Sequence, residues 1–145
     1  MPTVRRSPNA PARLSVDGLT AGYGSVPVVN EMSLSADPGK LVGIVGPNGS
    51  GKSTFIKSVM GIVKPVAGTV QMGSAFLHGR RSDQIVRAGI GYVPQVGDVF
   101  ANLTVSENLD MGGYLHRDAR EMRKQYVLDL FPLLASRMKQ RAGTL

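Results

Sequence analysis

The residues best suited to chemistry form a glycine-rich stretch, GPNGSGKS, at positions 46–53. Its spacing is that of a phosphate-binding loop, in which backbone N–H groups converge on phosphate oxygens at the start of a helix. The glycines let the backbone turn and approach a ligand closely. Lys52 can reach the β- and γ-phosphates, and the Ser53 hydroxyl can ligate Mg²⁺. The stretch therefore predicts binding of a nucleoside triphosphate with Mg²⁺.

Chance and local context both favour this interpretation over a flexible turn. From the composition of the chain, such a match is expected only roughly 0.01 times by accident. The preceding residues 40–45, KLVGIV, read as a strand buried on both faces. The following residues 53–60 read as a helix closed by Gly61. Its inward-facing residues should be Phe55, Ile56, Val59 and Met60.

The segments before the loop indicate antiparallel strands. Apolar residues predict a first strand over 14–19, which ends at the turn-prone residues 22–24. Residues 26–29 form a short apolar piece, and residues 32–36 alternate between apolar and polar side chains. A turn is expected at 37–39. Together these segments predict an antiparallel meander.

The segments after the loop mix strands and helices. A helix should begin after Thr104, because Glu107 completes the spacing of a capping box. A longer helix is expected over 118–131, interrupted or ended by Pro132. The remaining expectations are two short β-like runs within 68–79, a short helix over 82–88 and a strand over 89–93.

Length and composition limit the classes of protein to which this chain can belong. The chain has 145 residues, a globular mix of 42% hydrophobic and 19% charged residues, and no cysteine, which excludes disulfides and thiolate chemistry. Its net charge of +7 comes from the two ends, whereas the middle is balanced, which argues against a nucleic-acid-binding face. No apolar run approaches the length of a membrane span. Residues 1–12 lack the apolar core of a signal peptide and read as a disordered leader.

Four motifs, in order, resemble those of an ABC transporter ATP-binding subunit. The loop continues as GPNGSGKST, typical of that family. The residues 22–24, GYG, resemble the aromatic loop whose ring stacks on adenine. Residues 91–95, GYVPQ, resemble the Q-loop, and residues 103–109, LTVSENL, resemble the segment that opens the helical subdomain.

The resemblance implies an α/β P-loop NTPase fold of the ABC ATPase type, incomplete in this chain. The expected parts are a nucleotide-binding core with an antiparallel β subdomain over 13–98 and the beginning of the helical subdomain over 99–145. ATP and Mg²⁺ are the implied cofactors. Gln95 is the candidate catalytic residue and, with Ser53, the candidate metal ligand. The implied nucleotide-binding residues are Tyr23, Gly46, Pro47, Asn48, Gly49, Ser50, Gly51, Lys52, Ser53 and Thr54.

Later segments resemble the branched-chain amino acid uptake type. They are MGGYLHRD at 111–118, LDLFPLLASR at 128–137 and QRAGTL at 140–145. Urea and short-chain amide importers look much the same. The implied partners are membrane permease subunits and a second ATP-binding subunit, without nucleic acid. The implied location is peripheral, at the cytoplasmic face of the inner or plasma membrane.

Parts of the family pattern have no counterpart here. The signature motif would begin at Leu145, no stretch reads as a Walker B strand, and neither His78 nor His116 matches the switch histidine. The resemblance thus implies the N-terminal part of a subunit. We expect no useful ATPase activity from this chain alone, because phosphoryl transfer needs groups that position water and metal. Exposed apolar surface and marginal stability are also expected.

Three alternatives remain open at this point. The chain could be a P-loop kinase, a non-catalytic fragment that binds nucleotide or permease, or a soluble ABC ATPase of nucleic-acid metabolism. The aromatic loop, the Q-loop and the LTVSENL segment argue against the kinase.

Overall fold

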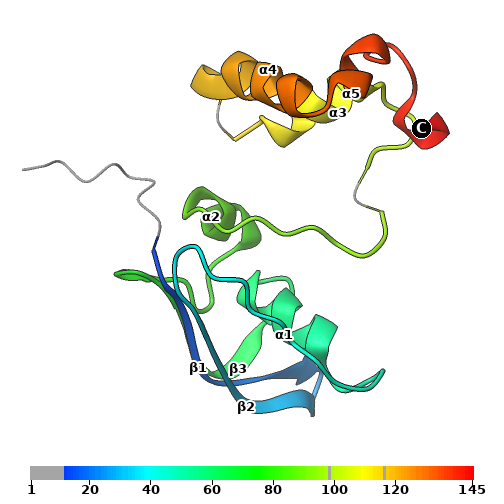
Figure 1. Cartoon of the computed structure of the whole chain (residues 1–145). Coiled ribbons are helices and arrows are strands. Elements are labelled where there is room, and N and C mark those ends of the chain that lie inside the picture. The colour runs from blue at the N-terminus through cyan, green and yellow to red at the C-terminus, as the bar shows by residue number, and fades with distance from the viewer. Residues whose placement is uncertain (1–11, 98, 116) are drawn as a thin grey trace, which may run out of the picture. The chain divides into compact units, whose positions relative to one another are not determined.

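The computed structural model describes residues 12–97, 99–115 and 117–145. The chain divides into two compact units, with the boundary between Tyr92 and Val93 (Figure 1). The leader predicted for residues 1–12 lies almost entirely outside the described residues, as does His116. The functional division at 98 and 99 stays a prediction.

The first unit contains a four-stranded antiparallel sheet in the order β2-β1-β3-β4. The strands are β1 (Leu14–Tyr23), β2 (Val26–Ala36), β3 (Pro65–Met72) and β4 (Ala75–Phe76). Strand β1 lies between β2 and β3 and pairs with both along most of its length. The antiparallel pattern predicted for the segments before the loop is confirmed, and so are the two short runs after it.

Helix α1 (Lys52–Val59) packs on this sheet and builds the core (Figure 1). Phe55 is 1% exposed and lies in one cluster with Leu19 and Val16 of β1. The prediction that Ile56 faces inward is wrong, because this side chain is 37% exposed. Successive helical residues are about 100° apart, so a helix that buries Phe55 and Val59 turns Ile56 toward solvent.

Two predicted strands do not form. Residues 40–45 and 89–93 adopt no strand, although both are apolar. Leu41 is 101% exposed and Val45 is 93% exposed, so the exposed apolar surface expected for this chain is present. A strand exists through hydrogen bonds to a neighbouring strand, and no described residues pair with either segment. Helix α2 (Ser82–Arg87), which precedes the second of these segments, forms as predicted.

The second unit is helical. The capping box is confirmed: the Glu107 N–H donates to Thr104 Oγ1 at 3.2 Å, and the Thr104 N–H donates to Glu107 Oε2 at 2.7 Å. Pro132 occupies the first turn of a new short helix, as its missing N–H allows. The elements are α3 (Val105–Gly112), η1 (Arg117–Ala119), α4 (Arg120–Leu130), α5 (Pro132–Ser136) and η2 (Ala142–Thr144).

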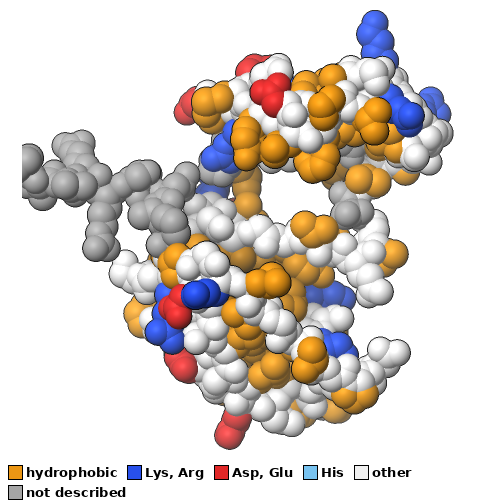
Figure 2. Space-filling view, viewed as in Figure 1, with side chains coloured by type: hydrophobic (Ala, Val, Ile, Leu, Met, Phe, Trp, Pro, Cys, Tyr) orange, Lys and Arg blue, Asp and Glu red, His pale blue; other side chains and the backbone are white. Residues whose placement is uncertain are grey.

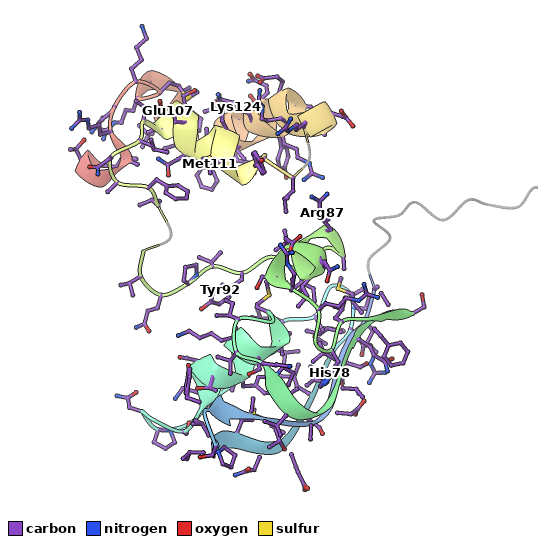
Figure 3. All side chains as sticks on the ribbon, turned by 180° about the vertical axis from the view of Figure 1, so that it is seen from behind. His78, Arg87, Tyr92, Glu107, Met111 and Lys124 are labelled. Atoms are coloured by element: carbon purple, nitrogen blue, oxygen red, sulfur yellow. The ribbon has the colours of Figure 1, made fainter. Side chains whose placement is uncertain are left out.

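Side-chain hydrogen bonds connect the parts of this unit. Asn108 on α3 accepts from the Phe100 N–H at 2.8 Å and donates to the carbonyl oxygens of Phe100 and Thr104. Lys124 on α4 donates to Asp110 Oδ1 at 3.0 Å and to Ser106 Oγ at 2.8 Å, both on α3. Figure 3 shows Lys124 and Glu107 on these adjacent helices. In the part of the chain that the structure describes, no helix is long and apolar enough to cross a membrane.

Candidate functional site

The candidate site is the loop that joins the extended segment 40–45 to α1. Its backbone takes left-handed conformations that favour glycine, with φ of 82° at Gly49 and 87° at Gly51. Gly51 is also the N-cap residue of α1. The residues from Gly46 to Ser50 are exposed. The loop is therefore shaped by its glycines and open to a ligand.

Lys52 reaches back across this loop. Its Nζ atom donates to the carbonyl oxygen of Gly46 at 2.8 Å and to that of Pro47 at 2.6 Å. The amine is thereby held at the mouth of the loop, beside the Ser50 hydroxyl at 3.5 Å. This geometry places a positive charge where the phosphate groups of a nucleotide would enter.

The N-terminus of α1 offers further attraction for an anion. No side chain caps it, and no acidic residue lies in its first turn. Its first backbone N–H groups and the positive end of the helix dipole therefore face the loop. Two of the first helical residues differ in exposure: Ser53 is exposed, whereas Thr54 is buried.

Strand β2 forms one wall of the site. A Cβ atom at Gly51 would lie 2.9 Å from the Val28 carbonyl oxygen and 3.1 Å from Val29 Cγ2, so only glycine allows the loop to approach the strand this closely. This contact was not predicted from sequence. No local signal could have found it, because it joins residues that are far apart in the chain.

Tyr23 lies at the end of β1, on the hairpin that leads into β2. It pairs with Val26 and is 57% exposed. At the neighbouring Gly22, an added Cβ would fall 2.0 Å from the Val26 carbonyl oxygen, so glycine permits the tight hairpin end that presents the tyrosine ring. Tyr23 and the phosphate loop belong to the same unit and are both accessible.

Gln95 lies in the second unit and is exposed. Ser53 belongs to the first unit, so the shared role of these two residues around Mg²⁺ stays a prediction. Among the described residues, no group of three His, Asp or Glu side chains could hold a metal ion. The residues present fit a triphosphate well. Ser53 is the residue among them that would ligate its Mg²⁺, and this role stays a prediction.

The chain matches known proteins along most of its length. Residues 29–145 match the family described as ABC transporter. The chain is 37% identical over 133 residues to the high-affinity branched-chain amino acid transport ATP-binding protein BraG of Pseudomonas aeruginosa. It is 38% identical over 133 residues to a probable branched-chain amino acid transport ATP-binding protein, LivF, of Archaeoglobus fulgidus. These matches cover 91% and 88% of this chain.

Solved structures confirm the predicted fold. The chain is similar to MJ1267, an ATP-binding cassette of an ABC transporter, with a TM-score of 0.77 and 25% identity over 92% of this chain. The chain spans 59% of that cassette, 57% of BraG and 54% of LivF. The α/β cassette fold with its antiparallel sheet is therefore shared over part of a full cassette.

Proposed function

The chain belongs to the ABC transporter family, and from this premise we propose that it binds ATP at residues 46–54 as part of a transporter's ATP-binding subunit. The observation that carries the proposal is the position of Lys52, held across the open loop by the carbonyl oxygens of Gly46 and Pro47. Members of this family are typically ATP hydrolases.

Each part of the site has a distinct task in this proposal. The backbone N–H groups at the start of α1 bind the β- and γ-phosphates, and Lys52 neutralises their charge. The Ser53 hydroxyl would help to hold Mg²⁺, which would supply positive charge that screens the phosphates. The Tyr23 ring stacks on the base, an interaction that needs no base-specific hydrogen bond.

Titration with a fluorescent ATP analogue in the presence of Mg²⁺ tests this proposal. The Lys52→Ala variant should weaken binding at least about tenfold, because a hydrogen bond to a charged group contributes about 1.5–3 kcal/mol. Lys57→Ala is the matched control, since Lys57 lies on the same helix but in its last turn. Equal affinities for the two variants would contradict the proposed role of the loop.

Turnover is a separate question from binding. We expect little phosphate release from this chain alone, as the sequence predicts. A coupled assay for phosphate release, with full-length BraG as reference, tests this expectation. Transfer of phosphate to a small acceptor would instead favour the kinase alternative.

Branched-chain amino acids are the proposed cargo, with permease subunits and a second ATP-binding subunit as partners at the cytoplasmic face of the membrane. The support is the similarity to BraG and LivF, which extends over more of the chain than the similarity to the Nod factor and iron transport proteins. To test the cargo, this chain is fused to the remainder of BraG and expressed in cells that lack BraG. Restored leucine uptake by these cells is the expected result. Failure of a well-expressed fusion to restore leucine uptake would contradict the proposed cargo.

A further inference from the structure

Strand β2 departs from the strict alternation of inward and outward side chains. Met32 and Leu34 pack against the apolar cluster of the first unit, so a regular strand would turn residues 30 and 28 inward next. The buried residue is instead Val29, which is 4% exposed and belongs to that cluster. An extra residue in the strand explains the change, because one added residue moves the following side chains to the opposite face.

The extra residue lies next to Glu31. Leu19 of β1 pairs with position 32 and Ala21 pairs with position 29, so β2 carries one residue more than β1 between these pairs. Glu31 has a φ of 46°, a left-handed conformation that is uncommon for residues other than glycine. Its N–H donates to Thr20 Oγ1 at 3.1 Å, which ties the bulge to β1. Unfavourable backbone of this kind persists where the surrounding structure enforces it, and it concentrates at functional sites.

The inward Val29 lies beside the turn that joins the phosphate loop to α1. A Cβ atom at Gly51 would lie 3.1 Å from Val29 Cγ2. The Gly51 carbonyl oxygen accepts from the Phe55 N–H at 2.8 Å, and Phe55 belongs to the same apolar cluster as Val29. Lys52 follows Gly51 directly and reaches back across the loop. Val29 therefore limits where Gly51 and the start of α1 can lie.

The neighbouring valines of β2 lie at the surface. Val26 is 66% exposed and Val28 is 38% exposed, and Figure 2 shows apolar side chains at the surface of the first unit. Among residues 26–30, Val29 alone is buried. Its side chain thus connects the phosphate loop with the core of the sheet.

We propose that Val29 is a positioning residue for the triphosphate part of the ligand, and that the left-handed bulge at Glu31 keeps it turned toward the phosphate loop. Val29 itself touches no ligand atom. It acts through Gly51, by fixing the backbone N–H groups at the start of α1 in the arrangement that phosphate oxygens need. This role rests on the nucleotide-binding function proposed above and assigns a residue that sets the affinity for polyphosphate.

Truncation of Val29 to alanine would leave a cavity next to Gly51. Surrounding atoms relax only partly into such a cavity. A shift of the loop backbone then weakens its hydrogen bonds to phosphate, which depend steeply on distance and angle. The same truncation elsewhere in the cluster leaves a cavity that does not border the loop. The position of the lost volume, rather than its size, should decide the effect on binding.

Valine-to-alanine variants at three positions of the cluster test this role. Val16 and Val70, which pair with each other on β1 and β3, are buried like Val29, but Val29 is the one beside Gly51. The probe is inorganic triphosphate with Mg²⁺, which displaces the fluorescent ATP analogue from the full chain. Val29→Ala should weaken triphosphate affinity at least about fivefold, the equivalent of weakening one hydrogen bond to a charged group. Val16→Ala and Val70→Ala should change it by less than about twofold.

Glu31 offers a second test that leaves the core untouched, because its side chain is exposed. Glu31→Gly favours the left-handed backbone and should bind triphosphate as the parent does. Glu31→Val disfavours that backbone through its branched side chain and should weaken triphosphate binding, as Val29→Ala does. Equal affinities in the two Glu31 variants, or equal weakening by all three valine substitutions, would overturn the positioning role.

Amide exchange separates this role from the proposed function. The Phe55 N–H donates to the Gly51 carbonyl oxygen, so its exchange reports on the loop without any ligand. This exchange should be faster in Val29→Ala than in Val16→Ala. If the chain binds neither ATP nor triphosphate but shows this difference, nucleotide binding fails and the positioning of Gly51 by Val29 stands. If all variants bind ATP and triphosphate with the affinity of the parent, the positioning role fails and nucleotide binding stands.

Discussion

The first unit is built around a cluster of buried apolar side chains, whereas the parts of the second are connected by hydrogen bonds of polar side chains. A contiguous apolar cluster joins the sheet and α1 in the first unit. Among the described apolar residues of the second unit, only Val105 and Ala142 are buried. Hydrogen bonds of Asn108, Lys124 and the Thr104 capping box connect the parts of that unit. The first unit should therefore respond to loss of buried volume, and the second to loss of single polar groups.

The largest effect expected from this contrast is that of Phe55→Ala in the first unit. Removing a fully buried ring should lower the free energy of unfolding by about 3–5 kcal/mol, because it leaves a cavity in the core. Ile56→Ala, one position along the helix and 37% exposed, should cost about 1 kcal/mol or less. Urea unfolding followed by circular dichroism measures both. Similar losses would mean that the cluster does not hold this unit.

A smaller effect is expected for Asn108→Ala in the second unit. The substitution leaves the Phe100 N–H and several carbonyl oxygens without their partner, which should cost about 1–3 kcal/mol locally. Faster amide exchange at residues 100–104 would report it, with the sheet of the first unit unchanged. Asn102→Ala is the control, an exposed residue of the same type in this loop. Equal amide exchange in the two variants would mean that Asn108 does not hold residues 100–104 in place.

Lys124→Met should have a more modest effect, about 1 kcal/mol. The lysine side chain is 14% exposed and donates to Asp110 and Ser106, so methionine keeps most of its packing but removes the charge and both hydrogen bonds. Amide exchange in α3 and α4 should rise, and the parent should become more sensitive to salt than the variant. Lys139→Met, at an exposed position, should do neither. Unchanged amide exchange in Lys124→Met would mean that side-chain packing, and not the lysine charge, connects these helices.

The smallest effect concerns pH. Hydrogen bonds from the Thr104 backbone N–H and side chain hold the pKa of Glu107 below its ordinary value of 4.5. A lowered pKa in the folded state means that the stabilisation is complete above pH 4.5 and is lost as the pH falls through the lower, folded value. NMR should show the first turn of α3 fraying in that range. Glu107→Gln should remove this pH dependence, and a parent-like titration in the variant would assign it to another group.

Much of this architecture follows from local sequence signals. The alternation over 32–36, the glycine before α1 and the spacing of Thr104 and Glu107 each encode their structure within a few residues, and each prediction is confirmed. The phosphate loop is similarly local, since its glycines and Lys52 lie within one stretch. These features need no distant partner to form.

The errors arise where structure depends on residues far away in the chain. KLVGIV has every local property of a buried strand, but a strand forms only when another strand supplies hydrogen bonds, and none does among the described residues. The run of apolar residues in the helix predicts that Ile56 faces inward, whereas the direction of the helix against the sheet decides which side is buried. The pairing of Gln95 with Ser53 is not an error but stays a prediction, because the two residues belong to different units.

The close approach of Gly51 to the Val28 carbonyl oxygen also matters for anyone who redesigns this loop. The obstruction comes from a main-chain atom, so no substitution at position 28 can relieve it. A sequence library can therefore vary the side chain of Val28 beside the loop, but position 51 has to stay glycine in every member. Grafting the loop into another protein would require transplanting the hairpin with it, since the two are fitted to each other through their backbones.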